Sequence, residues 1–133
     1  MKRILVAEDR PASLELIRTV LESAGYEVIQ AADGQEAVEK ASGNPVDLVL
    51  LDLQMPKMDG FGVLAHLRRD AKFAKIPIVA LTASAMHGDR ERALAAGFSS
   101  YIAKPIDLTA LRSEMERLIG AEGCFGASER KSC

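Results

Sequence analysis

The sequence predicts an α/β protein with a five-stranded parallel sheet, strand order 2-1-3-4-5, and five flanking helices. The first observation is regular alternation: five short apolar runs are each followed by a segment with apolar residues at helical spacing. The second is the run 46–51, rich in Val and Leu, which indicates a strand buried on both faces. The third is that polar residues directly follow four of the runs. Such alternation implies parallel strands joined by right-handed crossovers, with helices on both sheet faces.

The first half of the chain predicts three strands and two helices. A strand over 3–7 precedes a helix that Gly25 ends, and residues 26–30 alternate as a short strand near a sheet edge. Asp33 and Glu36 have the spacing of a capping box at the start of the next helix, which a Gly-Asn-Pro sequence ends before the strand that closes at Asp52. The apolar positions of the two helices are Leu14, Ile17, Leu21, Ala24, Ala37, Val38 and Ala41.

The second half repeats the alternation. Residues 54–60 form a loop by their Pro and Gly content, and a helix follows. A strand over 76–81 leads through a looser segment, 83–89, to a helix closed by Gly97, and a last strand covers 100–103. Asp107 is expected to cap the final helix. The apolar positions expected in these two helices are Phe61, Leu64, Leu67, Leu108, Leu111, Met115 and Leu118.

Composition narrows the class of protein. The chain has 133 residues, 48% of them hydrophobic, and a net charge of −2, which favours one globular domain and gives no electrostatic case for nucleic-acid binding. No apolar stretch approaches the roughly 20 residues of a membrane span, and no signal-peptide pattern is present, so we expect a cytoplasmic protein without membrane contact. Both cysteines, Cys124 and Cys133, lie in the polar segment 121–133, which we expect to be a flexible tail with free thiols.

Three carboxylates are expected at one edge of the sheet. Glu8 and Asp9 follow the first strand and Asp52 ends the third, and the predicted order makes these strands neighbours, with the flavodoxin-like switch point between them. Acids this close repel each other unless a cation neutralises them, and Mg²⁺ prefers oxygen ligands. Asp9 and Asp52 are candidates for direct ligands, Glu8 for a ligand through water, and the backbone carbonyl of Gln54 for a further oxygen.

The remaining polar strand ends fit phosphoryl chemistry. A carboxylate such as Asp52 is able to form an acyl phosphate, which needs its charge held during transfer. Lys104 follows the fifth strand and offers a flexible ammonium for that purpose, and the Lys104-Pro105 bond is of the kind that can be cis. Thr82 ends the fourth strand and offers a hydroxyl, while Tyr101 lies within the fifth strand as a half-buried aromatic.

The chain resembles the receiver domain of two-component response regulators (CheY-like) over about residues 2–120. Four motifs in order give the resemblance, each placed after a predicted strand. They are Glu8-Asp9, Asp52 within 51–60, Thr82-Ala83 and Lys104-Pro105. The resemblance implies a receiver domain over 1–120, and it implies that the Lys104-Pro105 bond is cis.

The resemblance also implies roles for these residues. Asp52 would accept a phosphoryl group from a sensor histidine kinase or a histidine phosphotransfer protein, and Lys104 would pair with that group. Glu8, Asp9, Asp52 and the Gln54 carbonyl would hold Mg²⁺. Thr82 and Tyr101 would act as switch residues, and the face of the fourth helix, fifth strand and fifth helix would bind a downstream protein. The domain would be a signalling protein, not an enzyme, that promotes its own phosphorylation and dephosphorylation, and a monomer whose dimerisation on phosphorylation is left open.

Four other interpretations stay open. A pseudo-receiver would use the fold only as an interaction surface, but it would not need the complete polar set. A receiver belonging to a hybrid kinase or larger regulator would share every motif, although Met1 leads directly into the first strand and favours a single-domain regulator. An aspartyl-phosphate phosphatase would need an acid where Gln54 stands. A nucleotide-binding protein would need a glycine-rich phosphate loop, and the sequence has none.

Overall fold

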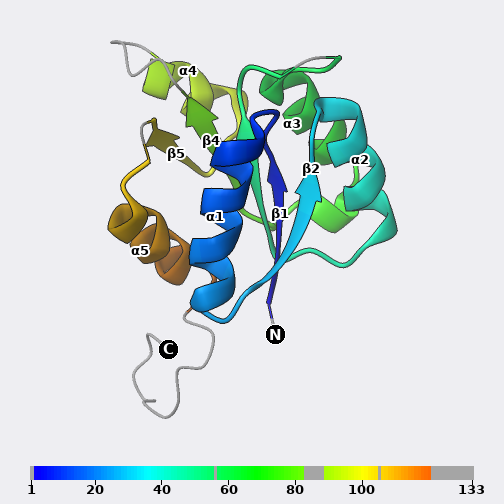
Figure 1. Ribbon diagram of the computed structural model, residues 1–133. Helices are drawn as coiled ribbons and strands as arrows, with labels where there is room; N and C mark the ends of the chain where they lie inside the picture. The colour runs from blue at the N-terminus through cyan, green and yellow to red at the C-terminus, as the bar shows by residue number, and fades with distance from the viewer. Residues whose placement is uncertain (1, 56, 83–88, 105, 121–133) are drawn as a thin grey trace.

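A five-stranded parallel sheet with the order β2-β1-β3-β4-β5 forms the centre of the computed structural model, which describes residues 2–55, 57–82, 89–104 and 106–120 (Figure 1). The strands are β1 (Arg3–Ala7), β2 (Glu27–Ala31), β3 (Leu48–Asp52), β4 (Ile78–Thr82) and β5 (Ser100–Ala103). The helices are α1 (Pro11–Ser23), α2 (Gly34–Gly43), α3 (Gly60–Arg68), the 3₁₀ turn η1 (Ala71–Phe73), α4 (Asp89–Ala96) and α5 (Leu108–Ile119). The predicted fold class, strand order and edge position of the second strand are therefore confirmed.

The two faces of the sheet bury two separate apolar clusters. Residues alternate between them along each strand, so that Leu5 and Ala7 lie in the cluster with α2 and α3, and Ile4 and Val6 lie in the cluster with α1 and α5 (Figure 1). β3 is buried at every position, as its unbroken apolar run predicts for a strand covered on both faces. Side chains on both faces thus fix the strands from which the polar groups project.

The register brings the first and third strands together at their carboxyl ends. Ala7 of β1 pairs with Leu51 of β3. The next residue of each strand, Glu8 and Asp52, therefore leaves the same edge of the sheet from neighbouring strands. This is the switch point of the strand order, where open α/β sheets place their sites.

Helix ends follow the predicted cap residues. Asp33 accepts a hydrogen bond from the Glu36 backbone N–H at 2.8 Å, which confirms the predicted cap, whereas the Glu36 carboxylate accepts a 2.6 Å bond from the N–H of Ala32, one residue before the cap residue of a standard capping box. Asp107 caps α5 through the backbone N–H groups of Thr109 and Ala110 at 2.9 and 3.1 Å. Gly25 and Gly97 follow helices with φ of 98° and 118°, which is the left-handed region that favours glycine.

Three details differ from the sequence prediction. β2 begins at Glu27, because the Tyr26 N–H donates to the Leu21 carbonyl of α1 at 3.0 Å; the Tyr26 side chain is only 2% exposed, and its hydroxyl donates a 2.8 Å hydrogen bond to the Gly120 carbonyl. Leu108 was expected on the apolar face of the last helix but is 38% exposed, since it occupies the first position of α5, before the helix packs on the sheet. η1 was not predicted, and its Phe73 is fully buried.

Some predictions fall outside the described residues. They concern the flexible tail 121–133, residues 83–88 of the looser segment 83–89, and the cis bond to Pro105. Within the described residues, every helix is too short or too polar to span a bilayer.

Candidate functional site

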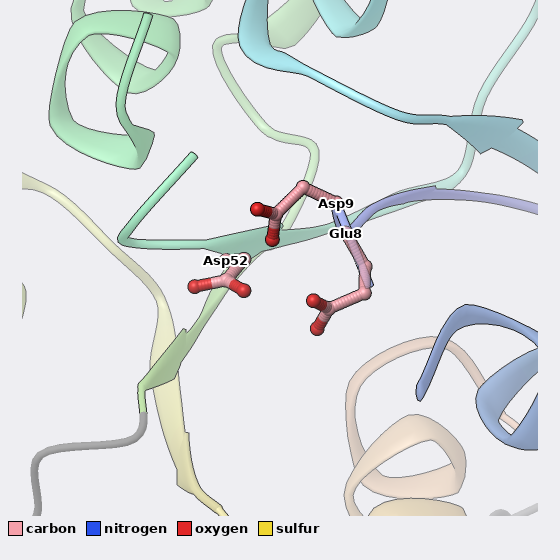
Figure 2. A group of neighbouring side chains, drawn as sticks. All are labelled: Glu8, Asp9 and Asp52. Carbon is pink, nitrogen blue, oxygen red and sulfur yellow. The ribbon is translucent and has the colours of Figure 1, made fainter. Parts of the chain in front are cut away.

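Three carboxylates meet at the carboxyl edge of the sheet. One oxygen each from Glu8, Asp9 and Asp52 lies within 4.8 Å of the others, and Figure 2 shows the three side chains converging from β1 and β3. Glu8 is fully buried and Asp52 is 4% exposed, whereas Asp9 is exposed. The cluster thus has two acids in the protein interior and one that is exposed to solvent.

Lys104 neutralises part of this charge. Its Nζ lies 2.6 Å from Glu8 Oε1 and 2.8 Å from Asp52 Oδ2, and its side chain is only 13% exposed. The Lys104 backbone N–H donates to the Thr82 carbonyl at 2.7 Å, which extends the β4–β5 pairing by one residue and fixes the start of the side chain. Three carboxylates against one ammonium leave a formal excess of two negative charges when all are ionised.

Burial and pairing shift the pKa of two of these groups. Desolvation raises the pKa of the Glu8 carboxyl; hydrogen bonds from Lys104 and the Arg10 backbone oppose that shift, and Asp52 adds to it. Burial alone would lower the pKa of Lys104, but its hydrogen bonds to Asp52 and Glu8 outweigh burial and raise that pKa. The lysine is therefore fully charged at neutral pH, while Glu8 takes up a proton more readily than an exposed glutamate.

Backbone groups orient the two buried carboxylates. Asp52 Oδ1 accepts a 2.9 Å hydrogen bond from the Gln54 N–H, and Glu8 Oε2 accepts one of 3.1 Å from the Arg10 N–H. The Leu53 N–H donates to the Leu81 carbonyl at 2.9 Å, so the chain leaves β3 still attached to β4. Asp52 therefore has one oxygen facing the backbone and one facing Lys104.

Thr82 ends β4, and Tyr101 lies on β5 opposite Ala80, two residues before Thr82. Thr82 is 3% exposed at the end of β4, and it pairs in register with Ala103, the residue before Lys104. Tyr101 is half-buried and packs against the apolar residues on the sheet face that α2 and α3 cover. Their predicted switch roles stay predictions, as does the role of the Gln54 carbonyl.

The donor set fits a hard divalent cation. It consists of three carboxylates with no thiol or imidazole among them, and oxygen-only ligands of this kind suit Mg²⁺ and Mn²⁺ rather than Zn²⁺. Because Asp9 is exposed to solvent, water can also reach the site as a ligand, and Mg²⁺ usually retains several ligand waters. The residues at this edge are thus chemically suited to the predicted metal.

Sequence reasoning placed the acids and Lys104 at one edge, and the structure brings them together. It did not anticipate that Lys104 contacts Glu8, because the expected partner of its ammonium was a phosphoryl group. It also did not anticipate the ion pair between Lys57 and Asp33, which was assigned only as a helix cap; the two side chains pair at 3.6 Å between the start of α2 and the loop after β3. The sequence has no local signal for either contact, since both depend on how distant segments pack.

Comparison with known proteins defines the family. Residues 4–116 match the model of the response regulator receiver domain, so the chain belongs to that family of signalling domains. The polar-differentiation response regulator DivK of Brucella ovis is 35% identical over 119 residues, which cover 90% of this chain and 97% of that protein.

Solved structures agree with this assignment. The chemotaxis response regulator CheY4 of Vibrio cholerae has a TM-score of 0.84 at 29% identity, covering 90% of this chain and 99% of that one. The receiver domain of sensor histidine kinase PA1611 from Pseudomonas aeruginosa, solved with a magnesium ion coordinated in its active-site cleft, has a TM-score of 0.83 at 38% identity, covering 90% and 98%. The predicted family and CheY-like fold are confirmed.

Proposed function

We propose that this chain is a phosphoacceptor response regulator in which Asp52 takes a phosphoryl group from a phosphohistidine. The observation that supports this most directly is the environment of Asp52: a carboxylate 4% exposed, paired with Lys104 and held within 4.8 Å of two further acids. A merely structural aspartate would not need two additional acids beside it. The matched family model supports a donor that is a histidine kinase or a phosphotransfer protein.

The transfer is a displacement at phosphorus. A carboxylate oxygen of Asp52 attacks the phosphorus, a new O–P bond forms, the N–P bond of the phosphohistidine breaks, and the leaving imidazole nitrogen takes up a proton. Hydrolysis resets the site: a water oxygen attacks the same phosphorus, the bond between phosphorus and the Asp52 oxygen breaks, and the water protons leave with inorganic phosphate, which restores the Asp52 carboxylate. Lys104 is placed to follow the negative charge from the carboxylate to the phosphoryl oxygens, since its ammonium is already 2.8 Å from Asp52 Oδ2.

Mg²⁺ is the proposed cofactor of this site. Asp9 and Asp52 would hold it directly, with Glu8 through water and the Gln54 carbonyl as a further oxygen. When bound, the ion supplies charge stabilisation to the phosphoryl oxygens. The carboxylate cluster and the magnesium-containing PA1611 receiver support this proposal.

The phosphoryl group would act as a switch through charge. It carries about −1.5 to −2 charges in place of the single charge of the free carboxylate, and it can shift a two-state equilibrium only through contacts that differ between the states. Thr82 and Lys104 would make those contacts, and Tyr101 would move with Thr82. The α4–β5–α5 face would then bind a downstream protein.

The remaining parts of the proposal concern context. We infer a receiver domain over 1–120 with a tail over 121–133, acting by protein contact and without direct nucleic-acid or membrane binding. Single-domain regulators and receivers of kinases both occur among similar proteins, so membership in a larger regulator is the alternative context. A phosphorylation-independent pseudo-receiver is the alternative function.

Intact mass after incubation with acetyl phosphate, with and without Mg²⁺, tests the proposal. We expect a gain of one phosphoryl group that requires Mg²⁺ and is lost in Asp52→Asn. Asp47→Asn is the matched control, because Asp47 lies just before the other end of the same strand and its carboxylate accepts a hydrogen bond from the Arg3 backbone N–H. Absence of any adduct in the wild type would favour the pseudo-receiver, and an adduct that persists in Asp52→Asn would assign the phosphoacceptor to another residue.

A further inference from the structure

The start of α2 presses against the loop that follows β3. Gly34 is the first residue of α2, and a Cβ atom built on it would lie 1.9 Å from the carbonyl oxygen of Met58 and 2.7 Å from the Met58 carbonyl carbon. Contacts below 3.0 Å essentially never occur for a real Cβ. Glycine is therefore required here because the two backbones approach so closely. Its φ is not in the left-handed region, so backbone conformation is not the reason.

Met58 is confined on other sides as well. A Cβ on Gly62, in the first turn of α3, would lie 2.8 Å from Met58 Cγ. The preceding residue, Lys57, has a φ of 71°, an uncommon conformation for a residue with a side chain. Its ammonium lies 3.6 Å from Asp33 Oδ2, although the lysine side chain is 64% exposed and the ion pair is correspondingly weak. The backbone packing at Gly34 is thus the main restraint on residues 57–58.

Both ends of the same loop are hydrogen-bonded at the end of β3, to Asp52 and to Leu53. The Gln54 N–H donates to Asp52 Oδ1 at 2.9 Å, and the Gly60 N–H donates to the Leu53 carbonyl at 3.2 Å. A Cβ on Gly60 would lie 2.8 Å from the Asp52 carbonyl oxygen, so the end of the loop returns directly onto the end of β3. We therefore expect a displacement at Met58 to be passed through Asp59 and Gly60 to the end of β3.

We propose that Gly34 is a positioning residue for the metal site, acting through Met58 on Gln54 and Asp52. The inference rests on the proposed function, in which the Gln54 carbonyl and Asp52 hold Mg²⁺. Gly34 itself does not contact the ion. Its role is to let α2 approach the loop closely enough to hold it in one place.

The expected effect follows from the size of the overlap. Alanine at position 34 would force the two backbones apart by about 1.1 Å to reach 3.0 Å. Changes in the groups that support metal ligands typically cost about 10–100-fold in metal affinity. We therefore expect Gly34→Ala to raise the Mg²⁺ dissociation constant by about 10–100-fold.

Calorimetric titration with Mg²⁺ and amide hydrogen exchange of residues 53–55 test this inference. Gly43→Ala is the matched control, because Gly43 ends the same helix and has no atom within 4 Å of its Cβ position. Helix propensity alone would make both variants slightly more stable. We expect weaker Mg²⁺ binding and faster exchange in Gly34→Ala only, and a folded Gly34→Ala protein with wild-type Mg²⁺ affinity would overturn the proposal.

A second variant covers the case in which Gly34→Ala does not fold. Met58→Gly removes the Cβ that lies 2.7 Å from the Gly34 Cβ position and gives the loop backbone more freedom, so we expect the Mg²⁺ dissociation constant to rise about two- to fivefold, and an unchanged value would refute the need for a tightly held loop. If the wild type binds no Mg²⁺, the proposed function fails. Hydrogen exchange is then the remaining test of whether Gly34 holds the loop after β3 in place. Faster exchange at 53–55 in Gly34→Ala but not in Gly43→Ala would support it, and equal exchange would refute it.

Discussion

Replacement of Lys104 by methionine should destabilise the metal-free protein by about 3–5 kcal/mol. Met keeps the apolar stem and removes the ammonium that lies 2.6 Å from Glu8 Oε1 and 2.8 Å from Asp52 Oδ2. At an effective dielectric constant of about 20, each contact corresponds to roughly 6 kcal/mol before desolvation. Desolvation of the buried ions offsets much of that attraction, and removing one partner of a buried pair typically costs about 3–5 kcal/mol.

The loss should depend on pH in a defined direction. Burial already raises the pKa of Glu8, and Lys104 opposes that shift, so the variant raises the pKa further. A carboxyl with a raised folded-state pKa binds more protons in the folded than in the unfolded protein, so its contribution to stability falls as pH rises from its unfolded value through its folded value. The Lys104→Met penalty should therefore be smaller at pH 5 than at pH 7.5.

Mg²⁺ should compensate the same loss. Lys104 and a divalent cation both neutralise Glu8 and Asp52, so the variant should bind Mg²⁺ at least about tenfold more tightly, which corresponds to about 1.4 kcal/mol. The Mg²⁺-induced rise in Tm should then exceed that of the wild type by about 6 °C, taking roughly 4 °C per kcal/mol for a domain of this size. Thermal unfolding at both pH values, with and without saturating Mg²⁺, measures all three effects.

The control is Lys75→Met, an exposed lysine beside Ile76 at the opposite end of the sheet. It changes the net charge equally and should alter stability by no more than about 0.5 kcal/mol. A Lys104→Met penalty that is the same at both pH values and equally large with Mg²⁺ would refute the electrostatic reasoning. The residue would then contribute by packing.

Three further predictions concern the scaffold and are measured by chemical denaturation. Arg68→Met should cost about 2–3 kcal/mol, because the Arg68 guanidinium donates to the carbonyls of Phe73, Ile76 and Gly97, which would lose their partner; a loss below 0.5 kcal/mol would mean that water replaces it. Asp107→Ala should cost about 1 kcal/mol and Asp107→Ser much less, since serine also caps a helix, and equal losses would argue against the cap. Tyr26→Phe should cost about 1 kcal/mol through the lost bond to Gly120, and no change would show that the bond is not formed in solution.

The fold and the membership of the site were predictable because both depend on patterns local in the sequence. An unbroken apolar run such as 48–51 specifies a strand covered on both faces, and the polar residue that ends it must then lie at the sheet edge. Strand order makes Glu8 a neighbour of Asp52 without any knowledge of side-chain geometry. The cap at Asp107 follows in the same way from one residue type at one position.

The contacts that the sequence did not reveal join residues that are far apart along the chain. Tyr26 reads as a strand residue by its pattern, but its burial and its bond to Gly120 depend on where α5 ends. Gly34 reads as an ordinary first helical residue, and only the packing of α2 against the β3–α3 loop shows that no side chain fits there. Which acid Lys104 contacts depends on the rotamer of a long, flexible side chain, which sequence does not determine.

The excess negative charge of the site couples metal binding to phosphorylation. Lys104 offsets only one of three carboxylates, so the metal-free site keeps an excess of two negative charges when all are ionised. A phosphoryl group on Asp52 would carry about −1.5 to −2 charges in place of the single carboxylate charge, an increase that such a site disfavours unless a divalent cation is also present. Because Glu8 and Asp52 both contact Lys104, a cation bound to these carboxylates would weaken their attraction for its ammonium, which would then be available to the phosphoryl oxygens. Mg²⁺ would thus promote transfer in two ways, by neutralising the acids and by releasing the lysine.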